Sequence, residues 1–313
     1  MTTYFNFASY KRRLANYRLF RKHIRAPLLT VELAARGEFV LNGEDADILI
    51  QSSDGDVMWQ KERLLNHGLS RLPENCRYVA WVDGDLLFED PEWIERAIEE
   101  LQRVPLLQPF SQVIHASRQA QVTGFEFNDG WIAQSAMGAA LAQGGSFENY
   151  MRAVMRRAAG TPASGMAWVA RRELLERHGW FDASIIGGGD TALVCAALGR
   201  PEMVAELHHH NARQRKYYEV WARPFYKEVQ GRVSHISGTI LHLWHGELPD
   251  RLPQERHQGL REYEFDPAVD ITIGKDGPWR WATEKPALHR YLQRYFAARL
   301  EDGRNHDSQL NVS

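Results

Sequence analysis

Short apolar runs alternate with amphipathic stretches along the first part of the chain. Apolar runs bounded by polar turns are typical of strands, whereas apolar residues spaced three and four apart indicate one face of a helix. On this basis we expect strands over 3–7, 28–33, 46–51, 78–82 and 104–110, separated by helices over 9–23, 58–72 and 92–103. Strands that alternate with helices in this way predict an α/β fold with a mostly parallel central sheet flanked by helices.

The second half of the chain adds further elements. We expect a strand over 165–170 and helices over 171–178, 191–198 and 284–300. A chain of 313 residues can bury one large core or at most two domains. The expected organisation is a main domain over 1–250 and a C-terminal helical extension over 251–313 packed on it.

Composition narrows the class of protein. Hydrophobic residues make up 44% and charged residues 25%, as in ordinary soluble globular proteins. The net charge of −2 provides no basic field, which disfavours nucleic acid as a partner. Cys76 and Cys195 lack zinc-type spacing and fit a reducing compartment. The sequence shows neither a signal peptide's apolar stretch nor the ~20-residue apolar run of a membrane span, so we expect a cytoplasmic protein.

Two carboxylates one residue apart follow the apolar run over 78–82. Side chains alternate along a strand, so Asp83 and Asp85 can point the same way where the chain leaves the sheet. Open α/β sheets bind ligands at the carboxyl ends of their strands. Two carboxylate oxygens there suit a divalent cation that also holds a phosphate. Similar pairs occur at 45–47 and 54–56, but neither of them lies between two apolar runs as the pair at 83–85 does.

A glycine-rich turn precedes a later apolar helix. Gly187, Gly188 and Gly189 lead into Asp190. Glycine permits positive φ and close approach of a ligand, and the aspartate lies at a helix N-terminus. A simple turn with a capping aspartate explains the same pattern and stays open. A phosphate-binding P-loop does not fit, because no Gly-Lys-Ser/Thr follows.

Two histidines three residues apart, His242 and His245, close a late apolar run. Their apolar, aromatic setting is compatible with core packing and with metal ligation, because imidazole binds Mn, Fe and Zn. A second cluster, His208–His210, lies in a polar stretch that predicts an exposed loop.

The three motifs together resemble a known family. Asp83-Gly84-Asp85, Gly188-Gly189-Asp190 and His242-x-x-His245 occur in the order seen in metal-dependent glycosyltransferases of the GT-A fold. The pattern is most similar to the inverting β-galactosyltransferase and related bacterial polysaccharide glycosyltransferases. The segment over 59–66, Trp-Gln-Lys-Glu-Arg-Leu-Leu-Asn, also looks like the basic helix ending in Leu-Asn of that family. The resemblance covers about residues 1–250, which would be the catalytic domain.

The resemblance implies a sugar nucleotide, favouring a UDP-sugar, as donor and a hydroxyl of a glycan or lipid-linked glycan as acceptor. It implies a metal, Mn²⁺ with Mg²⁺ as an alternative, because mixed carboxylate and imidazole ligands favour Mn²⁺. The expected metal ligands are Asp85, His245, His242 and Asp83. The expected donor-binding residues are Asp83, Lys61 and Asn66.

The resemblance also assigns the acceptor side of the site. Asp190 would be the catalytic base, because an inverting reaction needs one carboxylate to take the proton of the attacking hydroxyl. Gly188 and Gly189 would face the acceptor. Gly189 stands where the family commonly has a glutamate that helps bind the acceptor.

Four further candidates rest on position alone. Asn6 and Asp47, near two predicted strands, are candidate contacts of the donor nucleoside. Trp168 and Trp180 are candidates for stacking on an acceptor sugar, with core packing as the alternative. The basic helix over 11–25 is expected to pack on the sheet, with peripheral membrane contact as the alternative.

Two other function classes stay open. A metal hydrolase would use the histidines, although the chain lacks a His-Glu-x-x-His motif and the aspartate pair would be unused. A sugar-nucleotide-binding protein without turnover is suggested by Gly189 alone.

Overall fold

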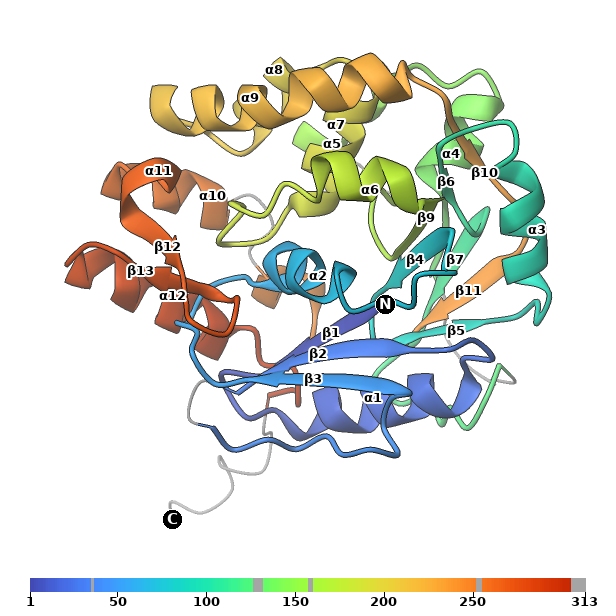
Figure 1. Ribbon diagram of the computed structural model, residues 1–313, viewed down its shortest axis with the longest axis horizontal. Helices are drawn as coiled ribbons and strands as arrows, with labels where there is room; N and C mark the ends of the chain where they lie inside the picture. The colour runs from blue at the N-terminus through green and yellow to red at the C-terminus, as the bar shows by residue number, and fades with distance from the viewer. Residues whose placement is uncertain (35–36, 126–131, 157–159, 252–254, 305–313) are drawn as a thin grey trace, which may run out of the picture.

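The computed structural model describes residues 1–34, 37–125, 132–156, 160–251 and 255–304 (Figure 1). The first elements are β1 (Thr2–Phe5), α1 (Lys11–His23), β2 (Leu29–Leu33), β3 (Ile48–Ser52), α2 (Lys61–Leu69), β4 (Tyr78–Val82), β5 (Leu86–Phe88), α3 (Trp93–Glu100), β6 (Leu106–Gln108), β7 (Gln112–His115), β8 (Ile132–Ser135), α4 (Met137–Ala142) and α5 (Phe147–Met155). The later elements are β9 (Ala167–Arg171), α6 (Arg172–His178), α7 (Gly189–Ala197), α8 (Pro201–Leu207), α9 (Ala212–Val229), β10 (Val233–His235), β11 (Thr239–His242), η1 (Leu248–Arg251), α10 (Glu255–Leu260), η2 (Arg261–Tyr263), α11 (Pro267–Asp270), β12 (Ile271–Ile273), β13 (Trp279–Trp281) and α12 (Pro286–Ala298).

Two sheets meet beside the first strand. The strands of one pair in parallel in the order β1-β2-β3, and those of the other lie in the order β10-β6-β9-β4. The N–H of Val82 donates to the carbonyl of Met1 at 3.1 Å, which places the end of β4 next to β1. Asp83 and Asp85 therefore leave the sheet at the junction between the two sets of strands.

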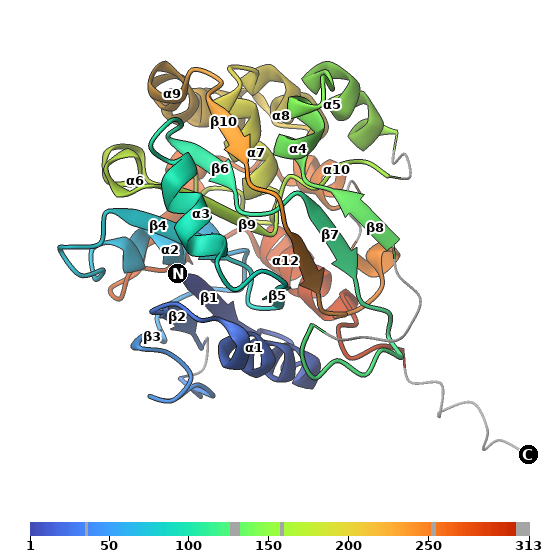
Figure 2. The same cartoon turned by 90° about the vertical axis from the view of Figure 1, so that its right-hand side faces the viewer.

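The expected α/β architecture is confirmed, but the expected single, mostly parallel sheet is wrong. β9 runs antiparallel to both of its neighbours, β4 and β6. A third sheet, β5-β11-β7-β8, contains both parallel and antiparallel pairs, as Figure 2 shows. The chain reaches β9 only after β7, β8 and two helices, so it enters this strand from the opposite end.

Helices α1 and α2 cover opposite faces of the β1–β3 sheet (Figure 1). Phe5 and Val31 pack in one core with Leu64 of α2. The ring of Tyr4 points to the other face and meets the ring of Tyr17 of α1, with centroids 5.4 Å apart. This alternation follows from the two-residue period of a strand and leaves the strand ends free for polar groups.

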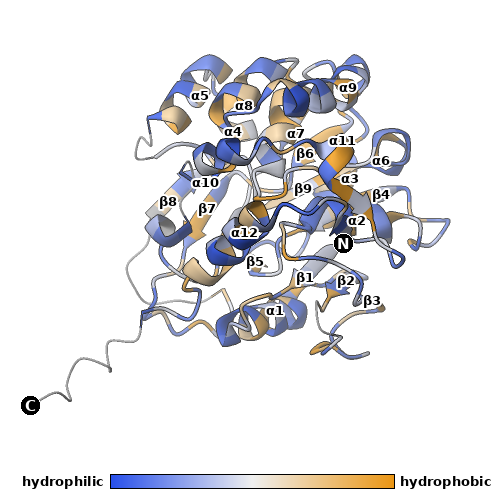
Figure 3. Ribbon diagram, turned by 90° about the vertical axis from the view of Figure 1, so that its left-hand side faces the viewer, coloured by the Kyte–Doolittle hydropathy of each residue, from blue (hydrophilic) through white to orange (hydrophobic). Residues whose placement is uncertain are grey.

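The C-terminal region shares the main core with the first half. Phe265, Trp279, Leu288 and Phe296 are buried in the same cluster as Phe5 of β1. Surface helices such as α5, α8 and α9 carry hydrophilic stretches outward (Figure 3). The expected division of the chain at residue 250 stays a prediction, but the later residues pack tightly on the earlier ones.

The polar stretch after α8 was expected to be an exposed loop, and this expectation is wrong. The Asn211 side chain accepts hydrogen bonds from the N–H groups of Arg213 and Gln214, and the Gln214 side-chain oxygen accepts one from the N–H of Asn211. This capping box starts the 18-residue helix α9. His208 is buried, and its ring stacks on His257 with centroids 3.9 Å apart.

The basic helix α1 packs on the sheet as expected. Tyr17 and Phe20 are buried, and Arg13, Arg18 and Arg21 form ion pairs with carboxylates. Within the described part of the chain, no helix combines the length and the apolar character needed to cross a membrane. Peripheral membrane contact through α1 stays a prediction.

Candidate active site

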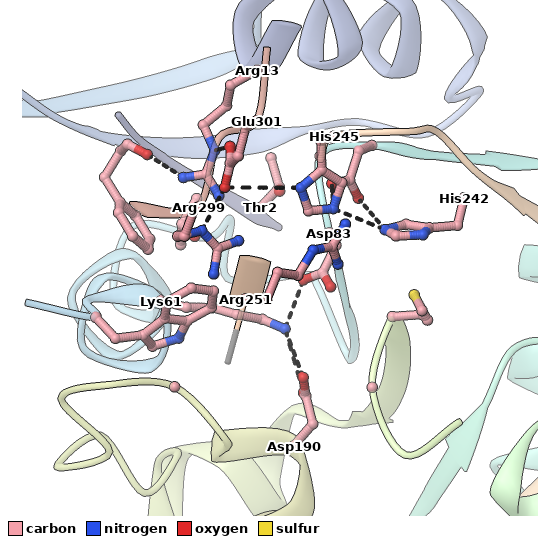
Figure 4. Close-up of a pocket in the computed structure, with 18 of the residues that line it drawn as sticks. Thr2, Arg13, Lys61, Asp83, Asp190, His242, His245, Arg251, Arg299 and Glu301 are labelled. Carbon is pink, nitrogen blue, oxygen red and sulfur yellow. Dashed lines mark hydrogen bonds and ion pairs between the residues drawn. The ribbon is translucent and has the colours of Figure 1, made fainter. Parts of the chain in front are cut away.

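A cavity of about 320 Å³ lies beside β1, next to the C-terminal ends of β4 and β11. Its walls come from β1, the loops after β4 and β11, the glycine turn before α7, and the segment over 299–301 (Figure 4). It brings together seven residues predicted from the sequence: Lys61, Asp83, Asp85, Gly188, Asp190, His242 and His245.

Lys61 links two of the predicted carboxylates (Figure 4). Its Nζ lies 2.6 Å from Asp83 Oδ1 and 3.1 Å from Asp190 Oδ2. Burial opposes the charge of Lys61, but the carboxylates of Asp190 and Asp83 outweigh this effect and raise its pKa. Lys61 is therefore a permanent cation between the two aspartates.

Asp190 lies in the first turn of α7, where the helix dipole favours a carboxylate. Burial raises the pKa of Asp190, and the charge of Lys61 works against that rise. A carboxylate with a raised pKa that still faces a cavity is a stronger base than an ordinary carboxylate and is suited to accept a proton.

Asp85, His242 and His245 form a cluster whose possible ligand atoms all lie within 4.8 Å of one another. His245 Nε2 is 3.1 Å from Asp85 Oδ2, and His242 Nε2 is 3.8 Å from Asp85 Oδ1. The two Nε2 atoms are 3.1 Å apart. Asp83 lies outside this cluster, because its carboxylate is bound to Lys61.

A chain of hydrogen bonds fixes the tautomer of His242. Gln134 donates its amide N–H to the carbonyl of Thr161, so its Oε1 faces His115 Nε2 at 3.0 Å as an acceptor. Neutral His115 then carries its proton on Nε2 and accepts at Nδ1. The Nδ1 of His242 lies 3.0 Å from that atom and must donate. The lone pair of His242 therefore sits on Nε2, which faces Asp85 and His245.

The cluster fits a divalent cation. Burial lowers the pKa of His245 to about 3 and the pKa of His242 well below its usual value, so both rings are neutral. Burial, together with the charge of Asp83, raises the pKa of Asp85 to about 7. Within the part of the chain that the structure describes, the buried Oδ1 of Asp85 has no hydrogen-bond partner. Two lone pairs and an unsatisfied carboxylate oxygen directed at one point are a suitable donor set for Mn²⁺.

The C-terminal segment completes this site from behind. Glu301 is 1% exposed, and its Oε1 accepts a 2.6 Å hydrogen bond from Arg299 Nε. The same Oε1 lies 3.8 Å from His245 Nδ1, and Oε2 lies 3.2 Å from Arg13 Nε. A carboxylate behind a ligating histidine favours the tautomer with the proton on Nδ1 and the lone pair on Nε2. Asp302 accepts hydrogen bonds from two backbone N–H groups at the start of α1, which anchors the segment.

Two more arginines from the C-terminal region line the cavity. Arg251 is close enough to Asp85, His242 and His245 to influence their pKa values. Its Nε is buried and has no hydrogen-bond partner among the described residues. Burial and the neighbouring Arg299 lower the pKa of Arg251 to about 10, so it stays cationic at neutral pH. Arg256 lies at the other side, next to Gly187.

The glycine turn is required by what lies behind it. Gly188 has φ of +93°, and a Cβ there would lie 2.5 Å from His208 Cε1. A Cβ on Gly189 would collide with the carboxyl group of Glu62, which is 5% exposed. Burial raises the pKa of Glu62 to about 8, so a neutral carboxyl fills the space of a side chain at residue 189.

Six predicted site residues do not line this cavity, and one of them is Gly189, which faces Glu62 as described above. Asn6 bonds the backbone of Tyr10, Asn66 bonds the backbone of Trp180, and Asp47 accepts from the N–H of Leu28. Trp168 and Trp180 are buried in the core. The binding roles predicted for Asn6, Asn66, Asp47, Trp168 and Trp180 stay untested, and we do not include these residues in the site below.

Several residues of the cavity and its supporting shell were not found from the sequence: Arg13, His115, Gln134, Arg251, Arg256, Arg299 and Glu301. Each comes from an element whose place depends on tertiary packing. The charged residues Arg299, Glu301 and Asp302, close together in the sequence, are the one local signal. Such charges at the end of a helix are common on exposed surfaces.

Comparisons with known proteins give distant likenesses. No protein-family model matches the chain, and no curated protein sequence matches it. Glucosyl-3-phosphoglycerate synthase from Mycobacterium tuberculosis, in complex with Mn²⁺, uridine diphosphate and glucosyl-3-phosphoglycerate, is 11% identical over 89% of this chain and 84% of its own, with a TM-score of 0.42. A glucose-1-phosphate thymidylyltransferase structure from Bacillus anthracis is 9% identical over 82% of each chain, with a TM-score of 0.31. At these scores the likenesses carry no argument, and the function must be inferred from the site.

Proposed function

We propose that this protein is a metal-dependent glycosyltransferase of the GT-A type. It would move a sugar from a nucleotide diphosphate donor, favouring a UDP-sugar, to a hydroxyl group of a glycan or lipid-linked glycan. The observation that carries the proposal is the Asp85–His242–His245 cluster, with its lone pairs directed inward by His115 and Glu301.

The proposed donor end of the cavity is the end that holds this cluster. A Mn²⁺ ion held by Asp85, His242 and His245 would neutralise charge on the departing diphosphate. The guanidinium groups of Arg251 and Arg299 lie beside these ligands in the same cavity. They add fixed positive charge where the leaving group gains negative charge, which is a main source of catalysis in such sites.

The proposed acceptor end is the start of α7. Asp190 would take the proton of the acceptor hydroxyl while that oxygen forms a bond to the anomeric carbon of the donor sugar. The bond from that carbon to the diphosphate oxygen breaks with its electron pair, which leaves with the diphosphate. A single displacement of this kind inverts the anomeric centre. Lys61, bonded to Asp190 and Asp83, holds the base in place between donor and acceptor.

The two alternative functions explain less of the site. A histidine-based hydrolase accounts for His242 and His245 but gives no role to the Lys61–Asp190 pair in the same cavity. His208 stacks on His257 behind the glycine turn and offers such a hydrolase no open metal site. A binding protein without turnover leaves the half-buried Asp190, which faces the cavity, unexplained. A cytoplasmic location and a peripheral membrane contact stay predictions that accompany the main proposal.

A thermal-shift panel tests the proposal. UDP, GDP, CMP and TDP are each added with Mn²⁺, with Mg²⁺ and with EDTA, and Zn²⁺ is added without a nucleotide. A ligand at a hundred times its dissociation constant stabilises the folded state by about 2.7 kcal/mol. We expect one nucleotide, with UDP favoured, to raise the melting temperature only when Mn²⁺ or Mg²⁺ is present. Stabilisation by zinc alone, with no response to any nucleotide, would contradict the proposal and favour the hydrolase.

A further inference from the structure

Arg256 lines the cavity beside the glycine turn. Its Nη1 donates a 2.6 Å hydrogen bond to the Tyr295 hydroxyl, and its Nε lies 3.4 Å from His257 Nε2. Both partners are neutral groups, because burial lowers the pKa of His257 well below its usual value. Among the described residues, no carboxylate pairs with Arg256, and its Nη2 has no hydrogen-bond partner. The side chain is thus held by two hydrogen-bond contacts, through Nη1 and Nε, and its Nη2 group is left to bind another molecule.

The remaining donor edge lies against the turn that leads to the proposed base. Arg256 Nη2 is 3.5 Å from the point where a Cβ on Gly187 would be, and the ring of Trp59 is equally close to that point. Gly187 and Gly188 line the cavity together with Asp190, two residues further on. A molecule whose hydroxyl approaches Asp190 therefore also comes close to the Arg256 guanidinium.

The charge balance of the cavity leaves room for an additional anion. Among the described lining residues, five side chains are cationic and four are carboxylates, which leaves one excess positive charge. A bound divalent cation adds two positive charges, and the diphosphate of a sugar nucleotide offsets two. One positive charge then remains, and a guanidinium in a partly desolvated pocket gains most from a charge-assisted, bidentate partner such as a phosphate or carboxylate.

We propose that the acceptor is anionic: it carries a phosphate or carboxylate that Arg256 binds while its hydroxyl faces Asp190. This inference rests on the proposed function and narrows the acceptor from any glycan or lipid-linked glycan to one with a negative charge near the reacting hydroxyl. Arg256 acts as a residue that determines specificity for the acceptor, and the donor diphosphate lies at the other end, beside the metal cluster and Arg251.

Calorimetry on the whole protein separates the two proposals. Wild-type protein is first titrated with UDP and Mn²⁺, and the resulting complex is then titrated with glycerol, glycerol 3-phosphate and glycerate as probes. The same series is run on Arg256→Gln, on Arg256→Lys, and on Arg261→Gln as a matched control. Arg261 is an exposed arginine five residues further along the same segment. Melting temperatures of all variants establish that they are folded.

We expect an anionic probe to bind wild type roughly tenfold or more tightly than glycerol, with the phosphate and carboxylate arms showing which anion is preferred. Arg256→Gln should remove this preference, Arg256→Lys should retain part of it, and Arg261→Gln should behave as wild type. UDP affinity should be the same in all four proteins. Equal binding of all probes to wild type, or an unchanged preference in Arg256→Gln, would overturn the inference. A loss of UDP affinity in Arg256→Gln would assign this arginine to the donor instead. Absence of UDP binding by wild type would refute the proposed function itself.

Discussion

Replacement of His115 by leucine tests the hydrogen-bond relay behind the metal cluster. His115 accepts the Nδ1–H of His242 at 3.0 Å, and leucine has a similar size but no acceptor. His242 would then be free to carry its proton on Nε2, which removes the lone pair from the cavity. Loss of such an outer-shell partner typically lowers metal affinity about 10- to 100-fold, or roughly 1.4–2.7 kcal/mol.

The assay is a titration of Mn²⁺ followed by electron paramagnetic resonance, which counts free ions without any need for turnover. His235→Leu makes the same change on another strand, β10, whose histidine does not line the cavity. His115→Gln keeps an acceptor oxygen and should retain part of the affinity if leucine fails to fold. Wild-type Mn²⁺ affinity in folded His115→Leu, alongside a large loss in His242→Ala, would refute the relay.

Three further predictions concern the carboxylates of the site. Asp190→Asn should keep its UDP and Mn²⁺ affinity but lose turnover by about 10²–10⁴-fold in a sugar-transfer assay, and near-normal turnover would place the base elsewhere. Because the pKa of Asp85 is raised to about 7, a proton competes with the metal below that pH. Mn²⁺ affinity should therefore fall about tenfold per pH unit below pH 7 and level off above it, whereas a flat profile from pH 6 to 8 would remove Asp85 from the ligands. Glu301→Ala leaves the buried Arg299 and the half-buried Arg13 without their shared partner, which should cost about 3–5 kcal/mol in denaturant unfolding and weaken Mn²⁺ binding. Glu301→Gln keeps an acceptor for His245 and should restore part of the Mn²⁺ affinity, and equal Mn²⁺ affinity in both variants would exclude a positioning role.

Local patterns predicted the elements that carry the reacting groups. The apolar run before Asp83 is β4, and the glycines before Asp190 open α7. These features depend on the strand period and on the φ values that glycine permits, so they can be read without knowledge of the fold. His242 and His245 were found because they end a strand in an apolar setting, which limits the roles that an imidazole can have.

The residues that support the site depend on contacts distant in sequence. His115 meets His242 only because β7 and β11 pair in a register that sets these two residues opposite each other, 127 positions apart. Register follows from the packing of the whole sheet, and a shift of one residue would turn His115 to the other face. Glu301 reaches His245 because α12 packs on the first half of the chain. Conversely, Asn66 matched a family pattern, but its side chain is used to hold the backbone of Trp180.

The most direct test of the account is calorimetric titration of UDP into the wild-type protein with Mn²⁺, repeated in EDTA and with Asp85→Asn. We expect saturable binding with Mn²⁺ that becomes at least about a hundredfold weaker in EDTA and in the variant, because the diphosphate and Asp85 would share the same ion. Equal UDP affinity under all three conditions, or no binding under any of them, would contradict the claim that Asp85, His242 and His245 hold a metal for a sugar nucleotide.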